Sequence, residues 1–492
     1  MVISTAVIFL SLSLAKALEF TILWITLRKK EIMAITNTPT EQIIEIAAAQ
    51  KEFFRSGKTL DISFRLSALK ALKAALRKWE KPLAEALWAD LHKSYEEAYL
   101  TELSIVLGEV DNHIRHLKQW AAPKRCSTPL KMFPSRSKII SEPLGNALII
   151  APWNYPVQLL LNPLVGAISS GCTAILKPSP YVERVSKVLE QLIAETFGTN
   201  YIAVVQGNRD VNTALLEQRY DIIFFTGSPS LGRKVMTAAA KNLTPVVLEL
   251  GGKSPCIVDK SAKLDVVARR IAWGKSLNAG QTCIAPDYLL VHKDVKQQLV
   301  EALAKEFRSL LGDNPKEFTH FVRIVNDKAF DRLVGYLEGA NVIYGGEHDK
   351  SERYIAPTLV DNVSPESPLM QEEIFGPIFP IVTFSETEEA IEFVNKRERP
   401  LALYYFGDNR TAKHLLRHTS SGGACVNDTI MHIANERLPF GGVGNSGMSS
   451  YHGRESFNVF SHRRAVVTTP TWLDVPFRYM PYKMFSLVKK IL

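Results

Sequence analysis

The sequence predicts an α/β protein whose central part is a doubly wound, mostly parallel sheet. From residue 146 onward, short apolar runs alternate with segments whose apolar residues recur at helical spacing. Strands separated by helices are typical of parallel sheets that helices cover on both faces. The runs expected to form strands are residues 147–151, 174–176, 202–205, 222–225 and 246–248.

The region before this sheet, residues 40–120, is predicted to be helical. Its apolar residues recur near the helical period of 3.6, and they are Leu66, Leu69, Leu72, Ala75, Leu76, Leu83, Leu87 and Leu91. A helix with one apolar stripe packs that stripe against the rest of its domain. We expect this region to be scaffold.

Length and composition indicate a globular protein of two or three domains. The chain has 492 residues, of which 46% are hydrophobic and 22% charged, which is ample to bury a core. The formal net charge is +9, but the basic residues are scattered and runs such as Arg28-Lys29-Lys30 are short. Nucleic-acid binding is not expected without a basic stripe.

The five cysteines are odd in number and widely spaced, with no CxxC pair and no Cys/His cluster of metal-ligand spacing. Disulfide frameworks and structural zinc sites both need such groupings. The sequence therefore predicts a reduced, cytoplasmic protein without a metal site.

The first 32 residues fit this interpretation poorly. Residues 2–27 are strongly apolar and precede Arg28-Lys29-Lys30, as in a membrane anchor with a basic flank. Lys16 and Glu19 interrupt the segment, and each charge near the centre of a span costs about 2.5–3.5 kcal/mol. We favour a misassigned start, with translation from Met33, and keep an anchor formed by residues 2–27 as the alternative.

Three expected strands are followed by residues that suit a ligand site. They are residues 152–156 (PWNYP), 177–179 (KPS) and 226–232 (TGSPSLG). Ligands of open α/β sheets bind beyond the carboxyl ends of the strands. In the last of these segments, Gly227 and Gly232 precede an expected helix at 233–240, whose N-terminus suits a pyrophosphate. A plain strand-to-helix turn is the alternative, because the segment does not match GxGxxG.

Cys283 and Glu249 are the candidate reactive pair. Cys283 ends the segment Gly280-Gln281-Thr282-Cys283, and Glu249 begins the compact motif ELGGK. A cysteine attacks as its thiolate, so it needs a base, and a carboxylate in a dry pocket can supply one directly or through water. Taken alone, Cys283 would more often be an inert buried thiol.

Asn154 and Lys177 are candidates for oxyanion and cofactor contacts. An amide N–H aimed at an attacked carbonyl stabilises the developing oxyanion, although Asn in such a loop is also a common turn residue. Lys177 could donate to a cofactor ribose or remain a solvated charge at the end of a strand.

Together these segments resemble the aldehyde dehydrogenases, in particular the class 3 branch that includes fatty aldehyde dehydrogenases. The resemblance runs from about residue 47 to residue 490, and its motifs are residues 152–156 (PWNYP), 249–255 (ELGGKSP), 280–288 (GQTCIAPDY), 371–377 (QEEIFGP) and 438–448 (LPFGGVGNSGM). Several ordered motifs of this length do not arise by chance. The implied fold is a Rossmann-type cofactor domain, an α/β catalytic domain and a small bridging or oligomerisation segment.

The resemblance implies a covalent mechanism. Cys283 would attack the aldehyde carbon, while the Asn154 amide and the Cys283 backbone N–H hold the oxyanion. Hydride transfer to the nicotinamide would leave a thioester, and Glu249 would activate the water that hydrolyses it. The implied substrates are medium-chain or long-chain aliphatic aldehydes, or aromatic aldehydes, which become carboxylic acids.

The resemblance also implies the contacts of an NAD or NADP cofactor. Glu373 would bind the nicotinamide ribose, Phe375 would lie against that end of the cofactor, and Lys177 would contact the adenosine ribose. The residues near the pyrophosphate would be Gly227, Ser228 and Gly232. Without the family, Glu372 and Glu373 would be taken as a solvated charge pair.

One residue departs from the family pattern. Many relatives have Glu three residues after the lysine, where this chain has Pro180. An acidic residue there favours a free 2′-hydroxyl and repels a 2′-phosphate, so its absence predicts activity with both NAD and NADP.

The expected organisation follows from the resemblance. Residues 36–248 would form the NAD(P)-binding domain and residues 249–450 the catalytic domain. Residues 124–142 and 451–492 would form the bridging segment, with strands at 137–141 and 465–469, through which a homodimer is expected. The tail, residues 479–492, could cover the substrate entrance, dock elsewhere or lie on a membrane.

Rival functions stay open at this stage. A cysteine hydrolase or acyltransferase could use Cys283 and Glu249 but leaves the dinucleotide-like turn unexplained. A CoA-dependent acylating enzyme would not need Glu249 for water, and a noncatalytic relative would not need to retain Asn154, Glu249, Cys283 and Glu373.

Overall fold

The computed structural model describes residues 36–474, 478–482, 485–486 and 489. The interpretations of residues 1–32 and of much of the tail lie outside these residues. Among the helices of the described part, none has both the length and the apolar character needed to span a membrane.

The N-terminal region is helical, as predicted. Its helices are α2 (Thr40–Arg55), α3 (Ile62–Lys78), α4 (Glu80–Leu91), α5 (Tyr95–Ala98) and α6 (Ser104–Ala121). The predicted stripe is buried at Leu69, Leu72 and Leu76, and Asp61 is the N-cap residue of α3, where its carboxylate accepts the Ser63 N–H. Between α5 and α6 lies a π-helical turn, η2 (Tyr99–Leu103).

The first sheet has the predicted doubly wound form. Its strand order is β17-β7-β6-β3-β4-β5, and all neighbours are parallel except β17, which is antiparallel to β7. The strands are β3 (Asn146–Ile150), β4 (Thr173–Lys177), β5 (Ile202–Val204), β6 (Ile222–Gly227), β7 (Val246–Leu250) and β17 (Gly447–Met448). The helices between them are α7 (Gln158–Ser170), α8 (Glu183–Thr196), α9 (Arg209–Leu216) and α10 (Pro229–Ala240). Every residue of α7 is buried, as expected for a helix that is apolar on all sides.

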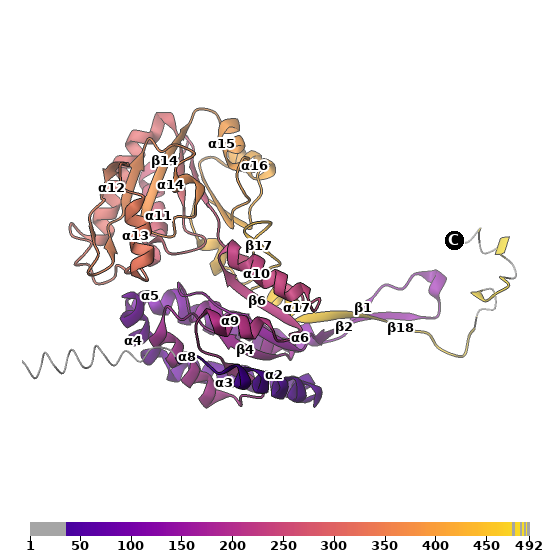
Figure 1. Cartoon of the computed structure of the whole chain (residues 1–492). Helices are drawn as coiled ribbons and strands as arrows, with labels where there is room; N and C mark the ends of the chain where they lie inside the picture. Colours follow the sequence, from indigo (N-terminus) through magenta and orange to yellow (C-terminus); the bar gives the residue numbers. More distant parts are fainter. Residues whose placement is uncertain (1–35, 475–477, 483–484, 487–488, 490–492) are drawn as a thin grey trace, which may run out of the picture.

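The second sheet forms the other large body, drawn in salmon and orange in Figure 1. Its order is β10-β13-β14-β9-β8-β15-β16. The strands are β8 (Pro255–Val258), β9 (Tyr288–His292), β10 (Asn341–Tyr344), β13 (Thr358–Asp361), β14 (Ile378–Phe384), β15 (Ala402–Phe406) and β16 (Gly423–Val426). The helices are α11 (Leu264–Ser276), α12 (Lys296–Leu311), α13 (Asp327–Gly335), α14 (Pro368–Gln371), α15 (Thr387–Asn395) and α16 (Asn409–His418), and a small ribbon pairs β11 (His348–Asp349) with β12 (Tyr354–Ile355).

The chain changes sheets later than the expected boundary at residue 249. Glu249 lies inside β7 of the first sheet, and the second sheet begins with β8 at Pro255. The segment between these two strands therefore joins the bodies, and Glu249 is placed at their junction.

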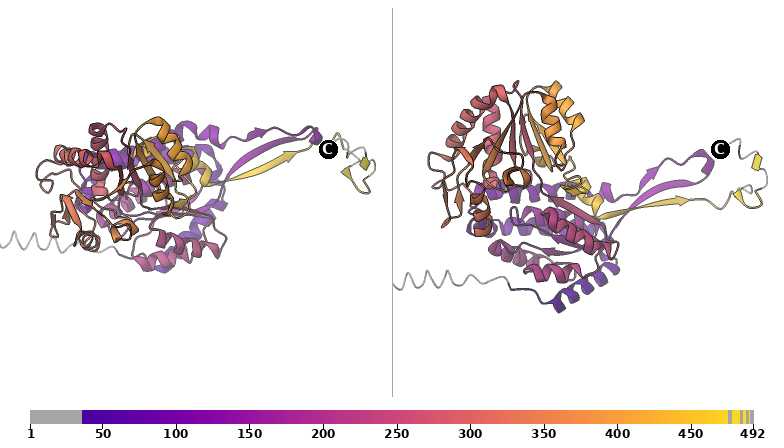
Figure 2. Two further views of the ribbon diagram at one scale, coloured as in Figure 1. Left: turned by 90° about the horizontal axis from the view of Figure 1, so that it is seen from above. Right: turned by 45° about the horizontal axis from the view of Figure 1, so that its top comes forward.

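The bridging segment is a three-stranded antiparallel arm. It contains β1 (Lys124–Cys126), β2 (Arg136–Pro143) and β18 (Ser461–Thr468), in the order β1-β2-β18. In the chain, β18 follows α17 (Arg454–Val459). Strands were expected at 137–141 and 465–469, and the structure has both, with β18 beginning four residues earlier. The arm projects from the body in each view of Figures 1 and 2.

Candidate active site

Cys283 lies in a tightly folded loop after α11. The short helix η4 (Leu277–Gly280) contains two non-glycine residues with left-handed backbone, Asn278 at φ 52° and Ala279 at φ 51°. Gly280 follows at φ 70°, and a Cβ there would lie 2.3 Å from the Gly376 carbonyl oxygen. The loop that carries Cys283 is thus pressed against the segment that carries the QEEIFGP motif.

Two cavities meet at Cys283. The smaller, of about 200 Å³, contains seven of the nine predicted site residues: Asn154, Gly227, Ser228, Glu249, Cys283, Glu373 and Phe375. The larger, of about 550 Å³, opens on the other side, and Cys283 and Leu159 line both. A thiol at this point can reach a molecule in either cavity.

The Cys283 thiol is partly buried, and burial raises its pKa. The nearby carboxyl groups of Glu373 and Glu249 raise that pKa further, because a thiolate would face their negative charge. The thiol is therefore protonated before substrate arrives, and its reaction requires a base.

Glu249 can serve as such a base. Its side chain is 2% exposed, and neither carboxyl oxygen has a hydrogen-bond partner among the described residues. Burial raises the pKa of Glu249 well above its ordinary value. A desolvated carboxyl group of this kind accepts a proton readily from a thiol or a water in the same cavity.

Asn154 is held from two sides. Its side-chain Nδ2 donates to the Gln281 carbonyl at 3.0 Å, and its own carbonyl accepts from Lys93 Nζ at 3.1 Å and from Asn278 Nδ2 at 3.0 Å. The amide nitrogen has a second hydrogen that these contacts leave available. The loop that carries Cys283 and the Asn154 side chain are therefore fixed relative to each other.

A fully buried ion pair supports this arrangement. Lys93 Nζ lies 2.7 Å from Glu102 Oε1, and both side chains have no exposed surface. The π-helical turn η2 carries Glu102, whose Oε2 also accepts the Val157 N–H at 2.7 Å near the start of α7. Lys93 lies 4.3 Å from the ring centre of Tyr155, whose hydroxyl bonds to Thr282 at 2.7 Å.

Glu373 and Phe375 form another wall of the smaller cavity. The pKa of Glu373 is raised to about 8 by burial and by the charge of Asp287, and its Oε1 is unpartnered within the part of the chain that the structure describes. Phe375 has a left-handed backbone at φ 52° and contacts Trp153 edge to face at 5.4 Å between ring centres. This wall offers a free carboxyl oxygen beside an aromatic surface.

The first turn of α10 suits an anionic group. Ser228 is the N-cap residue, and the side chain of Thr226 is buried without a partner among the described residues. Unpaired N–H groups at a helix N-terminus favour phosphate oxygens. The smaller cavity therefore places a carboxyl group, an aromatic surface and a helix N-terminus side by side.

The two remaining predicted residues lie outside the smaller cavity. Gly232 is buried in α10, where a Cβ would come within 2.8 Å of the Leu250 side chain, so it allows that helix to pack closely on the junction. Lys177 ends β4 with 1% exposure; its Nζ donates to the Pro178 carbonyl at 2.7 Å, and burial lowers its pKa to about 8.

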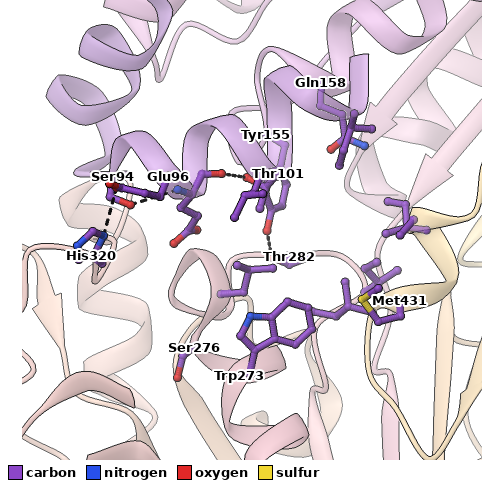
Figure 3. A pocket seen from close by; sticks show the side chains of 18 of the residues that line it. Ser94, Glu96, Thr101, Tyr155, Gln158, Trp273, Ser276, Thr282, His320 and Met431 are labelled. Carbon is purple, nitrogen blue, oxygen red and sulfur yellow. Dashed lines mark hydrogen bonds and ion pairs between the residues drawn. The ribbon is translucent and has the colours of Figure 1, made fainter. Parts of the chain in front are cut away.

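The larger cavity is mostly apolar. Its lining includes Leu100, Ile105, Leu159, Trp273, Leu311 and Ile430. Figure 3 shows it from close by, with the Tyr155–Thr282 hydrogen bond on its inner wall and the ion pair of Glu96 and His320 at one side. Glu97 also lines this cavity; its Oε1 accepts the Asn278 N–H at 2.9 Å, and burial raises its pKa to about 7.

Comparison with known proteins identifies the family. The model described as "Aldehyde dehydrogenase family" matches residues 26–466. The chain belongs to the aldehyde dehydrogenase family. A dimeric NADP-preferring aldehyde dehydrogenase of Canis lupus familiaris is 45% identical over 443 residues, which are 89% of this chain and 98% of that protein. Aldehyde dehydrogenase family 3 member A2 of Macaca fascicularis is 45% identical over 84% of this chain and 86% of its own length.

A solved structure supports the same assignment. The substrate-bound AldH of Staphylococcus aureus has a TM-score of 0.90 and 46% identity, covering 92% of this chain and 99% of that one. This aldehyde dehydrogenase is similar to class 3 members, as the motifs indicated, and it oxidises aldehydes with a nicotinamide cofactor. Among the described residues, no group of three or more His, Cys, Asp or Glu side chains could hold a metal ion.

Sequence reasoning missed the residues that support this aldehyde dehydrogenase's cavities, above all Lys93, Glu97 and Glu102. One signal was available. Ala98, Glu102, Val106 and Val110 recur every four residues, and the three apolar members are buried. A charge within an apolar stripe indicates a buried partner.

Proposed function

We propose that this chain oxidises apolar aldehydes to carboxylic acids through a covalent intermediate on Cys283. One observation carries the proposal: the Cys283 thiol lies where a large apolar cavity meets a smaller one that contains Asn154, Glu249 and Glu373. The apolar cavity can hold the hydrocarbon part of an aldehyde, and the smaller one holds the polar groups that the chemistry requires.

In the first step, the sulfur of Cys283 adds to the aldehyde carbon. Glu249 takes the thiol proton, directly or through a water, and the carbonyl oxygen becomes an oxyanion. The free N–H of Asn154 Nδ2 and the Cys283 backbone N–H stabilise this oxyanion. One such donor is worth about 2.7–4 kcal/mol.

In the second stage, the thiohemiacetal loses a hydride and becomes a thioester. The bound nicotinamide supplies the hydride acceptor. Glu249 releases the first proton to solvent and then removes a proton from water; the water oxygen attacks the thioester carbon, and Cys283 leaves as a thiolate that takes the proton back from Glu249. The balance is aldehyde, water and oxidised cofactor in, and carboxylate, reduced cofactor and two protons out.

The residues proposed to hold the cofactor line the smaller cavity or lie beside it. Glu373 would bind the nicotinamide ribose through its free carboxyl oxygen, with Phe375 against the ring. Ser228, Gly227 and the start of α10 would receive the pyrophosphate, and Gly232 lets that helix approach. Lys177, with two N–H groups not used by Pro178, would donate to the adenosine ribose.

The substrate class follows from the lining and length of the larger cavity. A cavity of about 550 Å³ with aliphatic and aromatic walls suits a medium or long alkyl chain or an aromatic ring.

We propose that NAD and NADP both serve. Pro180 stands where an acidic residue would repel a 2′-phosphate, and the buried ammonium of Lys177 is nearby in sequence. The canine relative is named NADP-preferring. We expect kcat/KM values for the two cofactors within about a hundredfold, or about 2.7 kcal/mol, measured at saturating aldehyde; a larger preference for NAD contradicts the proposal.

The test of the function is formation of reduced nicotinamide. Purified wild type and Cys283→Ser are compared by absorbance over aldehydes of increasing chain length, each with NAD and NADP. We expect reduction by wild type that strengthens with chain length and is lost in Cys283→Ser, because serine is a far weaker nucleophile at neutral pH. Well-folded wild type that hydrolyses thioesters but reduces no cofactor would instead support a hydrolase.

A further inference from the structure

A buried ion pair joins two of the sequence motifs behind the active site. Lys253 Nζ lies 2.5 Å from Asp287 Oδ2, and the side chains are 9% and 5% exposed. Lys253 follows Glu249 in the ELGGK motif, and Asp287 follows Cys283 in the GQTCIAPDY motif. The Asp287 N–H also donates to the Ser254 carbonyl at 2.8 Å, so the two segments are bound at backbone and side-chain level.

The same ion pair forms hydrogen bonds to the chain before and after Glu373. Lys253 Nζ donates to the Glu372 carbonyl at 2.8 Å and to the Leu369 carbonyl at 2.6 Å. Asp287 Oδ1 accepts the Ile374 N–H at 3.0 Å. The residues immediately before and after Glu373 are therefore both held by one ion pair.

The Glu373 side chain needs such external support. A Cβ on Gly251 would come within 1.9 Å of Glu373 Oε2, so the carboxyl group lies directly against the ELGGK backbone. Two residues later, Phe375 has a left-handed backbone at φ 52°, a conformation that persists only when the surrounding structure enforces it. Arg332 adds a bond to the Ile374 carbonyl at 2.7 Å from the outer side.

We propose that Lys253 and Asp287 are positioning residues that set the place of the Glu373 carboxyl group and thereby the productive binding of the nicotinamide cofactor. This inference rests on the proposed contact between Glu373 and the nicotinamide ribose. Lys253 uses its three N–H groups on Asp287, Leu369 and Glu372. Removing the ammonium frees the Glu373 segment, and misplacement by about 1 Å can cost on the order of a hundredfold in rate.

The test is a double-mutant cycle between Lys253→Met and Glu373→Gln. With a long-chain aldehyde saturating, kcat/KM for the cofactor is measured in wild type, in each single variant and in the double variant. We expect Lys253→Met to lower kcat/KM at least tenfold in the wild-type background. In the Glu373→Gln background we expect Lys253→Met to lower kcat/KM less than twofold, because the ion pair acts through the Glu373 carboxyl group.

Further variants separate positioning from folding. Asp287→Asn keeps an acceptor for the Ile374 N–H but loses the charge, so we expect a smaller loss than in Lys253→Met. Lys296→Met is the matched control, because Lys296 pairs with Asp361 in the same body, both side chains are partly buried, and within the described part of the chain Lys296 makes no hydrogen bond or ion pair to residues 371–375. Its cofactor kcat/KM should stay within twofold of wild type, and the rate of Cys283 alkylation by iodoacetamide should be unchanged in Lys253→Met.

The outcomes are distinguishable. If Lys253→Met lowers kcat/KM equally in both backgrounds, the positioning role is wrong and the ion pair serves folding. If it changes the rate of Cys283 alkylation by the same factor as kcat/KM, the positioning role is wrong and the ion pair serves the Cys283 loop. Glu373→Gln with wild-type kinetics would overturn the positioning role as well, while leaving aldehyde oxidation intact. Wild type without activity would refute the proposed function itself. The positioning role would then be tested by NADPH titration, in which Lys253→Met should bind NADPH more weakly than wild type. If Lys253→Met does not fold, Asp287→Asn decides.

Discussion

Cys283, Glu249 and Glu373 share one physical property, which is that burial raises the pKa of each. Three acidic groups in one dry cavity cannot all ionise cheaply, because each negative charge penalises the others. The Cys283 thiol therefore needs a proton acceptor before it can react, and in the proposed mechanism the carboxylate form of Glu249 is that acceptor.

Glu97 extends this argument into the apolar cavity. Burial raises its pKa to about 7, against lowering contributions from Lys93 and the Asn278 N–H, while Glu102 raises it. Below that pH the carboxyl group is neutral and tolerates a hydrocarbon neighbour. Above that pH the Glu97 carboxylate is charged, and a bound alkyl chain that displaces its water leaves this charge without solvation, which weakens binding of the chain.

We predict a loss of chain-length preference as pH rises through about 7. The ratio of kcat/KM for decanal to that for acetaldehyde should fall roughly three- to tenfold between pH 6 and pH 8, because only the longer chain meets Glu97. Taking the ratio cancels the titration of Cys283, which both substrates share. In Glu97→Gln the ratio should be flat with pH, and a ratio that still falls would assign the effect to Glu96, His320 or another group.

At the scale of elements, the sheet strands were predictable from the sequence because parallel strands are buried on both faces and appear as continuous apolar runs. β4, β6 and β7 include the expected runs, and β3 and β5 each end one residue before the expected run does. The π-helical turn η2 could not be predicted. Its sequence, YLTEL, differs little from an ordinary helix, and Glu102 in this turn contacts Lys93 and the Val157 N–H, which are partners outside the turn.

The candidate site likewise contains residues that the sequence predicts and residues that it does not. Cys283, Glu249, Asn154 and Glu373 stand in motifs, and the structure brings them to one cavity. Lys93 and Glu102 are charged residues in a helical region, where such residues are usually solvated, and the apolar stripe around Glu102 indicates its burial without indicating its partner. Their partnership depends on tertiary packing.

For this pair we predict that stability and activity separate. Lys93→Met leaves the Glu102 charge buried without its partner and should lower the free energy of unfolding by about 3–5 kcal/mol in urea denaturation. The double variant Lys93→Met/Glu102→Gln removes both charges and should recover most of that loss. Its kcat should nevertheless stay at least tenfold low, because the Asn154 carbonyl has lost its Lys93 donor.

Lys73→Met is the control for this prediction. Lys73 pairs with Asp111 between α3 and α6 and is partly exposed, so its loss should cost at most about 1 kcal/mol and leave kcat unchanged. A double variant that regains both stability and full kcat would show that the pair serves only the fold.

At the scale of the whole molecule, the two sheet bodies meet at the active site and the arm stands apart from both (Figures 1 and 2). The domain boundary at residue 249 was placed by motif, whereas the chain leaves the first sheet only after Leu250. A motif marks chemistry, and the chemistry lies at the junction of the bodies. The extent of a strand is set instead by its neighbours, here β6 and β17.

The arm carries the last prediction. β18 is an edge strand of eight residues, and within the described residues its outer edge pairs with no other strand. Val467 is 51% exposed on this strand, and Leu130 and Phe133 are exposed in the connection between β1 and β2. Long exposed edges with apolar side chains favour pairing with another chain. We propose that the chain forms a homodimer and that the second copy pairs at this edge.

Val467→Glu should therefore shift the protein from a dimer toward a monomer of 55.0 kDa, measured by size-exclusion chromatography with light scattering at micromolar concentration. The added charges would face each other or meet apolar surface across the interface. The matched control is Ile343→Glu, which places the same charge on β10, an edge strand of the second sheet with a comparably exposed apolar residue. If Ile343→Glu dissociates the dimer and Val467→Glu does not, the copies meet through the catalytic body and the arm has another partner.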